Sequence, residues 1–380
     1  MKNFRIFFVC FCFLIFLSGC TKQSGATIIK FASWGSKSEV DIIKPIIKEY
    51  ENKNPNVKID FIHIPQNYFQ KIHLLFASNT APDVIFINNL NLPIYANANV
   101  LEELSVPEGF YPQAIKALSY KGKLYAIPRD VSNLVIFYNK DLFDRLNVPY
   151  PKENWTFNDF LTTSQKLTKN NSFGISFEED IMFYLPYLMS EGGGVLSDDL
   201  SNLIIEKNES KKGLNFYADL RKKYHVAPLK YESASATMAQ LFLQEKIAMH
   251  LSGRWLVPKY RTDAKFDWDI INFPHGSVGS VVPLDASGWA VSKYSKHKNE
   301  AKKFIDFLAS KECCEKFTKS GLIVPARIDV SESEIFLDGK KPKNAKVFIE
   351  TIKTSKPTPV SVNYNEISND IKRYTEKIFN

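Results

Sequence analysis

The sequence predicts an α/β protein with more than one domain. Strand-like and helix-like segments alternate from residue 28, where TIIKFAS is followed by a helical pattern, VKIDFIHI, YFQKIHLLFAS and DVIFI. Strands that alternate with helices through short links favour a parallel sheet covered by helices. About 360 of the 380 residues follow the apolar N-terminal segment, and a chain of that length is too long to form a single hydrophobic core. We therefore expect two domains.

The first two helices carry start signals and apolar faces. SEVD at 38–41 has the form of a capping box, and the apolar residues after it recur at helical spacing up to Tyr50. Pro45 lies inside this segment, so we expect a kink or a late start of the helix. The second helix is expected at YFQKIHLLFAS, before Pro82 and the strand DVIFI.

A second α/β region follows Pro128. LVIFYN is an expected strand, and TFND at 156–159 is an expected capping box that opens a helix through Leu167. The strands FGISF, KIAMHL and FDWDII alternate with helical patterns at 180–189, 209–223 and 236–244. GWAVSK is the last expected strand, and helices are expected over 297–319 and 343–378.

The N-terminus has the pattern of a secretory signal peptide. Lys2 and Arg5 precede an apolar run over residues 6–17, which is shorter than the ~20 residues that a membrane-spanning helix needs. The ending LSGC resembles a bacterial lipobox. That resemblance implies that residues 1–19 are removed, that Cys20 carries lipid at the mature N-terminus, and that residues 20–25 form a tether. Ordinary cleavage, with Cys20 an incidental thiol, is the alternative.

Charge and cysteine usage narrow the function classes. Removing Lys2 and Arg5 from the formal charge of +8 leaves +6, and these charges form no Lys/Arg block, so no nucleic-acid partner is expected. The body of the chain holds only the adjacent Cys313 and Cys314, which excludes a long-range disulfide. We expect both to face a core from a helix. No repeat at a fixed period is present.

Several motifs, taken in order, resemble one protein family. They are FASWGS, YENKNPNVKIDF, FQKIHLLFASNTAPDVIFI, LYAIPRDVSNLVIFYNKDLFDRLNVPYPKENWTFNDF, LPYLMSEGGGVL, FLQEKIAMHLSGRW, SGWAVSKYSKHKNEAKKFIDFLAS and GLIVPAR. Together they resemble the extracellular solute-binding proteins of bacterial ABC importers, a family that includes sugar- and glycerol-phosphate-binding members. The resemblance covers residues 28–328, and residues 329–380 carry little that matches.

The resemblance implies a type II fold of the periplasmic-binding-protein kind, with a ligand cleft between two α/β lobes. Three crossings would join the lobes, near 128–132, 282–287 and 325–329. An N-terminal lobe would comprise 26–130 plus 285–326, and a C-terminal lobe would comprise 131–284 plus 327–380. Ligand would bind between the lobes and close them by a hinge motion.

Glycine-flanked tryptophans are the leading candidates for stacking on a sugar. A sugar presents C–H faces and a rim of hydroxyls, so its binding needs aromatic rings and directional hydrogen bonds. Glycine beside a large ring permits a tight turn at a loop tip. The candidates are Trp34, Gly35, Trp255, Gly288 and Trp289, with core packing as the alternative for each ring. Trp155 and Trp268 lack this setting and are assigned to packing.

Polar candidates lie in loops and at the crossings. Open α/β sheets bind ligands at strand ends, which points to the residues after VKIDFIHI and DVIFI. The polar candidates are Asn67, Tyr68, Asp83, Asn88, Asp130, Glu191, Gly193 and Arg327. For Asp83 a role at the start of its strand is an open alternative, and a glycine cap is one for Gly193. Arg129 and Asp130 are expected to pair with each other, and an interlobe salt bridge is equally open for Arg327.

Enzymatic signatures are absent from the sequence. It has no Gly-x-Ser-x-Gly elbow, no histidines at metal-binding spacing and no Walker A motif, so we expect no catalytic residue, metal or cofactor. A glycosidase needs only two suitably spaced carboxylates, which leaves a secreted carbohydrate-active enzyme open as the alternative, beside a peptide-binding lipoprotein.

The resemblance therefore implies a substrate-binding subunit of an ABC importer, and the absence of enzymatic signatures agrees with this expectation. A lipid would hold this monomer at the outer face of the cell membrane, on the extracellular or periplasmic side. It would capture a sugar or related polyol by lobe closure and deliver it to the membrane permease subunits.

Overall fold

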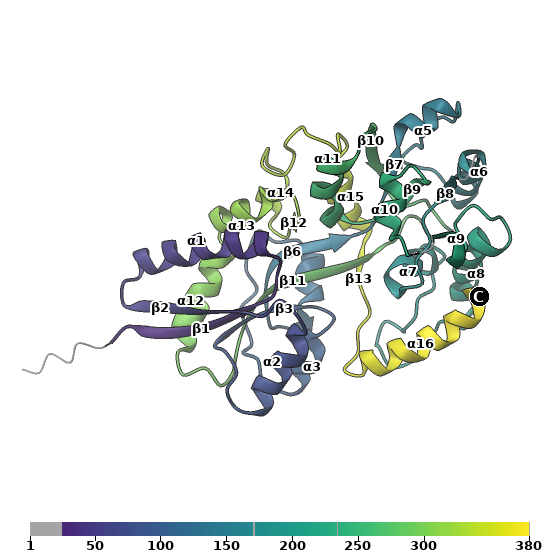
Figure 1. The fold of residues 1–380 in the computed structure, drawn as a ribbon. Coiled ribbons are helices and arrows are strands. Elements are labelled where there is room, and N and C mark those ends of the chain that lie inside the picture. The colour runs from purple at the N-terminus through teal and green to yellow at the C-terminus, as the bar shows by residue number, and fades with distance from the viewer. Residues whose placement is uncertain (1–24, 170–171, 234, 380) are drawn as a thin grey trace, which may run out of the picture.

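Two β-sheets organise the chain (Figure 1). The computed structural model describes residues 25–169, 172–233 and 235–379; the expected signal peptide and Cys20 lie outside these ranges. Within them, no helix is long and apolar enough to cross a membrane. A two-stranded ribbon is added by β4 (Ser119–Tyr120) and β5 (Lys123–Leu124).

The first sheet combines parallel and antiparallel strands. Strands β1 and β2 run parallel over their whole lengths, β3 runs parallel to β1, and β11 is antiparallel to both β3 and β6. The carboxyl ends of β1, β2 and β3 therefore lie at one edge of the sheet. In spatial order the strands are β12 (Val324–Pro325), β6 (Ile127–Asn133), β11 (Pro283–Val291), β3 (Val84–Asn88), β1 (Thr27–Ser33) and β2 (Val57–His63), with β13 (Lys356–Pro357) paired to β11.

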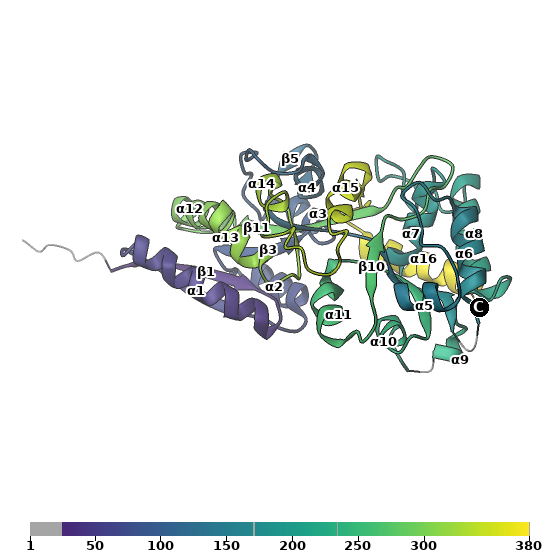
Figure 2. The same cartoon turned by 90° about the horizontal axis from the view of Figure 1, so that it is seen from above.

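Helices cover both faces of the first sheet. Figure 2, seen from above, places α1, α12 and α13 along it, while Figure 1 shows α2 and α3 below it. These helices are α1 (Lys37–Lys53), α2 (Tyr68–Ala77), α3 (Leu92–Asn97), α4 (Pro112–Ala117), α12 (Lys298–Leu308), α13 (Lys311–Thr318) and α14 (Ile328–Ser331).

The second sheet is smaller and contributes to two hydrophobic clusters: Ile136 and Met249 lie in a cluster separate from the first sheet, whereas Phe137 and Trp268 join the cluster that contains the core of the first sheet. Its strands, in spatial order, are β10 (Trp268–Ile271), β7 (Val135–Asn139), β9 (Ile247–Ser252) and β8 (Phe173–Ile175). Helices around it are α5 (Lys140–Arg145), α6 (Phe157–Leu167), α7 (Ile181–Ser190), α8 (Asn208–Lys222), α9 (Lys230–Ser233), α10 (Met238–Leu243), the 3₁₀ turn η1 (Arg254–Leu256) and α11 (Val257–Asp263).

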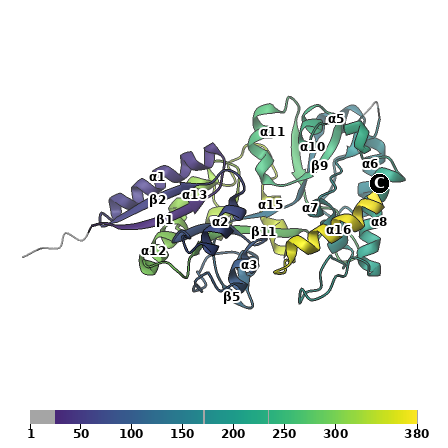
Figure 3. The ribbon, with the colours of Figure 1, turned by 60° about the horizontal axis from the view of Figure 1, so that its bottom comes forward.

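The chain passes between the two sheets at several places. Only Leu134 separates β6 of the first sheet from β7 of the second, and residues 272–282 lead back from β10 to β11. After α14 the chain forms α15 (Lys346–Thr354), which contacts both β6 and β7, and then β13. Finally, α16 (Tyr364–Phe379) packs against α8 beside the second sheet (Figure 3).

The first helix begins earlier than predicted. Its N-cap is Ser36, whose hydroxyl accepts from the Glu39 backbone N–H, while the Glu39 carboxylate accepts from the Ser36 N–H at 3.0 Å. The capping box is therefore SKSE rather than SEVD, and the expected late start is wrong, because α1 is assigned without a break through Pro45. The predicted capping box at Thr156 and Asp159 is confirmed.

Helix α1 is joined to α13 by a charged network. The Lys316 ammonium lies 2.5 Å from Glu49 and 3.1 Å from Glu312, and Lys53 lies 2.7 Å from Glu49. Hydrogen bonds from Lys316 and then Lys53 lower the pKa of Glu49 to about 2. The network ties two segments far apart in sequence to the same side of the first sheet.

Replacing Glu49 by Gln should make the protein less stable near neutral pH by at most about 1 kcal/mol, because the ion pair is partly exposed. A carboxylate whose pKa is lowered on folding stabilises the fold above its unfolded pKa and loses that effect as pH falls towards 2. The difference between wild type and Glu49→Gln in urea unfolding should therefore shrink between about pH 4.5 and pH 2.5. A difference that stays constant over this range would contradict the assignment.

Candidate functional site

A pocket of about 790 Å³ lies at the carboxyl ends of β1 and β2. Its walls are the loop after β1, the first turns of α1, the loop after β2 and the start of α2. Four predicted ligand residues line it together: Trp34, Gly35, Asn67 and Tyr68. The loops after β1 and β2 lie side by side because the two strands are parallel, with Ser33 opposite His63. This arrangement is the physical basis for expecting polar groups to converge at strand ends.

Local backbone geometry shapes the two loops of this pocket. Gly35 has φ of 127°, a conformation that favours glycine, and it turns the chain from β1 towards α1. Asn67 adopts the left-handed region at φ 53° immediately before α2 and remains exposed. His63 joins the loops, because its Nε2 lies 2.9 Å from the carbonyl oxygen of Gly35.

Trp34 forms the aromatic wall of the pocket. Its half-buried ring makes edge contacts with three other rings. The centroid distances are 5.6 Å to Tyr68, 5.0 Å to Phe69 and 5.1 Å to Phe86. Three edge contacts fix the ring from behind while part of its surface faces the pocket. A ring held in this way can stack on an apolar face without losing side-chain freedom.

Tyr68 supports this wall and uses its hydroxyl within the fold. The hydroxyl donates to the Ala32 carbonyl oxygen at 3.0 Å and accepts from the Phe86 N–H at 3.1 Å. Burial raises the pKa of Tyr68 well above its usual value. The residue therefore lines the pocket while its polar group joins α2 to β1 and β3.

A buried charged group stands behind the pocket. Glu39 lines the pocket and its Oε1 lies 3.5 Å from Nη1 of Arg129, whose Nε donates to Asp130 at 2.5 Å. The predicted Arg129–Asp130 pair is thus present in the structure. Burial raises the pKa of Asp130 despite the opposing effect of Arg129. The guanidinium also stacks on Phe86 at 4.4 Å, so it is held on two sides.

The end of β3 is connected to β11 by side-chain hydrogen bonds. Asn88 holds the turn after β3 by accepting from the Asn91 backbone at 3.1 Å. Asn89 donates to Asp285 at 3.0 Å and accepts from the Ala286 N–H at 3.0 Å. Sequence reasoning missed Asp285, Glu39 and His63 as parts of this region. His63 stands at the end of a predicted strand, so its place near the pocket could have been predicted. The Asn89–Asp285 pair could not, because 196 residues separate the two partners in the sequence.

In the second lobe the candidate residues are held by separate contacts. Glu191 is buried, pairs with Lys212 at 2.6 Å and accepts from Ser277. A Cβ on Gly193 would lie 2.4 Å from the Ser210 backbone nitrogen, so this glycine permits close packing against α8. Trp255 is half-buried, and its ring lies directly over Gly253, where a Cβ would come within 1.9 Å of it.

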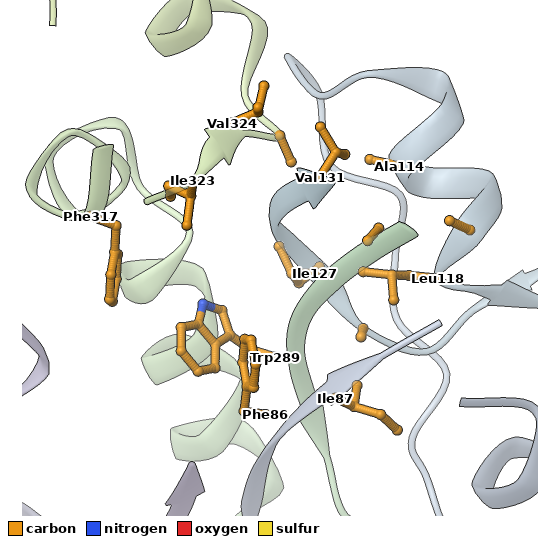
Figure 4. Close-up of a cluster of buried hydrophobic side chains, with 14 of the residues drawn as sticks. Phe86, Ile87, Ala114, Leu118, Ile127, Val131, Trp289, Phe317, Ile323 and Val324 are labelled. Carbon is orange, nitrogen blue, oxygen red and sulfur yellow. The ribbon is translucent and has the colours of Figure 1, made fainter. Parts of the chain in front are cut away.

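Two of the glycine-flanked candidates lie in the core instead. Trp289 is fully buried, with its ring centroid 4.9 Å from that of Phe86 and 6.1 Å from that of Phe317 (Figure 4). A Cβ on Gly288 would lie 2.1 Å from the Ile127 carbonyl oxygen. The glycine does permit a close approach, as predicted, but the approaching group is the neighbouring strand β6 rather than a ligand.

Asp83 and Arg327 also have partners within the fold. Asp83 stands at the start of β3, away from the pocket, and accepts from the Lys30 N–H at 2.8 Å and from Ser295 at 2.5 Å. Arg327 makes a two-pronged contact with Asp329, at 3.0 and 2.9 Å. The position of Asp83 corresponds to the alternative left open for it, a role at the start of its strand, whereas the Arg327–Asp329 pair is local and is not the interlobe salt bridge that was the alternative for Arg327.

No cluster of metal-ligating side chains occurs among the residues that the structure describes. Cys313 and Cys314 are free and buried, and burial raises the pKa of Cys314 to about 12. The sulfur atoms therefore pack as small apolar groups, in agreement with their predicted place on a core-facing helix.

Comparison with known proteins identifies the family. Residues 35–312 match the family described as bacterial extracellular solute-binding protein. The chain belongs to this family. Among its relatives is the galactooligosaccharide-binding protein of Bacillus subtilis, 24% identical over 390 residues that cover 96% of this chain and 90% of that protein. The multiple sugar-binding protein of Streptococcus mutans is 24% identical over 80% of this chain and 77% of its own length.

Solved structures confirm the predicted fold class. An ABC substrate-binding protein of Listeria monocytogenes, solved in complex with cycloalternan, superposes with a TM-score of 0.82 at 28% identity, covering 93% of this chain and 94% of its own. A sugar-binding protein of Xanthomonas citri superposes with a TM-score of 0.81 at 20% identity, over 93% and 92% of the two chains. The fold of this family member is thus the two-lobed type II arrangement, with its cleft between lobes.

Gly288→Ala should destabilise the protein by about 1–3 kcal/mol, because the new methyl group has no room against the β6 backbone. Gly194→Ala is the matched control: its Cβ would meet Ile204 at an ordinary 3.6 Å, and the expected change is below about 0.5 kcal/mol. Urea unfolding of both variants measures the difference. Equal stability of the two would refute the close approach at Gly288.

Proposed function

We propose that this protein is the substrate-binding subunit of an ABC importer, which captures a sugar between its lobes and delivers it to a membrane permease. The observation that carries this proposal is the pocket at the ends of β1 and β2, where a fixed tryptophan stands among polar groups. Relatives named for galactooligosaccharide and for multiple sugars match most of the chain and support a sugar as the solute. The proposal includes no chemical reaction of the solute.

The charges that line the pocket favour a neutral solute. Lys37 and Lys44 carry two positive charges there, and Glu39 and Asp41 carry two negative ones. Lys37 also pairs with Asp41 at 2.6 Å. The four charges sum to zero, so these side chains give the pocket no net positive charge with which to attract a phosphorylated polyol.

In this proposal each lobe contributes one aromatic platform. Trp34, Gly35 and Asn67 are the ligand-contact residues of the first lobe, with Tyr68 as their support. Trp255 is the corresponding ring in the second lobe, because it is only half-buried and lies close after β9. Closure would bring the two rings to the solute, and it is driven only by the contacts that the closed state adds.

Thermal unfolding of the purified protein against neutral sugars, oligosaccharides, polyols and sugar phosphates tests the proposal. A cognate neutral sugar at about 100 times its dissociation constant should stabilise the protein by roughly 2.7 kcal/mol, a shift of several degrees. Trp34→Ala and Trp255→Ala should abolish the shift, while Arg327→Ala should retain most of it because its side chain is engaged with Asp329.

Two results would count against this assignment. A shift with sugar phosphates alone would replace the neutral solute by an anionic one. Silence of the whole panel, with the protein folded and free of bound solute, would favour the carbohydrate-active enzyme or a peptide as ligand.

We further propose that Cys20 carries the lipid that holds the protein at the membrane. The LSGC motif at residues 17–20 supports this, and β1, the first strand of the fold, begins shortly after it, at Thr27. Mass spectrometry of the N-terminal peptide from membrane-extracted protein should show Cys20 as the first residue, with acyl groups added. An unmodified Cys20, or cleavage elsewhere, would refute the anchor.

A further inference from the structure

The three arginines near the lobe crossings differ in how their charge is compensated. Arg129 has carboxylate partners in Asp130 and Glu39, and Arg327 has one in Asp329. Arg254 is only 3% exposed, and its Nε and Nη1 have no hydrogen-bond partner among the described residues. It therefore stands apart from the other two.

The surroundings of Arg254 are aromatic and positively charged. Its guanidinium lies 4.0 Å from the ring centroid of Phe336 and 5.6 Å from that of Phe348. The charged groups that shift its pKa are Arg261, which lowers it, and Asp338, which raises it, and both oxygens of Asp338 are already bound to Arg261 at 2.9 Å. These three side chains together carry a net charge of +1.

A buried charge of this kind requires a counter-charge. Desolvation, followed by repulsion from Arg261, lowers the pKa of Arg254 to about 9, which is still above physiological pH, so the group stays charged. Stacking on two rings offsets only part of the desolvation cost, and buried charges in proteins are paired or bound. Water can satisfy the N–H groups but leaves the charge uncompensated.

We propose that the Arg254 guanidinium, beside Phe336 and the Arg261–Asp338 pair, binds a small inorganic anion of the chloride type. This site is separate from the solute pocket. Trp255 packs against one hydrophobic cluster of the second sheet, whereas Phe336 and Phe348 belong to the other cluster, which spans both sheets, so neighbouring residues 254 and 255 face different surroundings. A sugar stacked on Trp255 is therefore not placed to supply the anion.

The site lies where the lobes meet. Ser252, at the end of β9, pairs with Val135 at the start of β7, one residue beyond the crossing at Leu134. On the other side, the carbonyl oxygen of Phe348 accepts from Asn133 at 2.8 Å. A bound anion would thus hold the 336–348 segment against η1 and α11 and stabilise the arrangement of the two lobes.

Crystals of the protein soaked in sodium bromide test the proposal directly. An anomalous peak beside the Arg254 guanidinium is expected, and its absence, with bromide visible elsewhere in the same crystal, would overturn the site. This test uses the unmodified protein, so it does not depend on whether a variant folds. A peak at exposed lysines alone counts as absence.

Thermal unfolding provides the solution test. At constant ionic strength, replacing gluconate by chloride or bromide should raise the midpoint by a few degrees in a saturable manner. Arg254→Met should lose this anion dependence, while the control Arg145→Met, at an exposed ion pair with Glu245, should keep it. Equal midpoints in all three anions would overturn the proposal, and so would a rise with sugar phosphates but not with chloride. None of these outcomes bears on neutral sugar binding at Trp34.

Discussion

The antiparallel pairing of β6 and β11 is the constraint on which the rest of the structure depends. β6 continues through Leu134 into the second sheet, and β11 returns from that sheet, so the same two paired strands carry the chain in both directions. Their register, from Leu284 opposite Asn133 to Trp289 opposite Ile127, sets where each lobe begins. The close contact at Gly288 is part of this register, because a side chain there would separate the strands.

The same strand pair links the core of the first lobe to the candidate binding wall. Phe86 contacts Trp289 on the core side at 4.9 Å, Trp34 on the pocket side at 5.1 Å and the Arg129 guanidinium at 4.4 Å. Trp34 is therefore positioned by a continuous series of edge and tilted aromatic contacts that starts in the buried sheet. A ring with such support loses little conformational entropy when a solute packs on it, which is an advantage for a receptor whose pocket must be ready before the lobes close.

Local signals in the sequence predicted the elements, and they could not predict which neighbour each element would meet. The strand at residues 27–33, the Thr156 capping box and the helical place of Cys313 all follow from short patterns. Trp34 and Trp289 each have a glycine beside them, yet one lines a pocket and the other is buried, because burial is decided by the strand order of the sheet. The spacing of residues in the sequence does not reveal that order, because β11, which begins at Pro283, lies between β6 and β3 in the sheet.

Charge compensation is the second feature that only the folded chain reveals. Arg129 lies in β6, where β11 and α1 bring carboxylate and aromatic groups from distant parts of the sequence around it. Arg254 is just as buried but meets rings and another guanidinium, and the carboxylate that acts on it, Asp338, is hydrogen-bonded to Arg261, so the fold compensates its charge only in part. An ion buried with incomplete compensation costs several kcal/mol, on the order of the stability of a whole domain, and the proposed anion would offset this cost. The two arginines therefore differ in function under these proposals. Arg129 is neutralised by carboxylates beside a pocket suited to a neutral solute, whereas Arg254 binds an anion at a separate site.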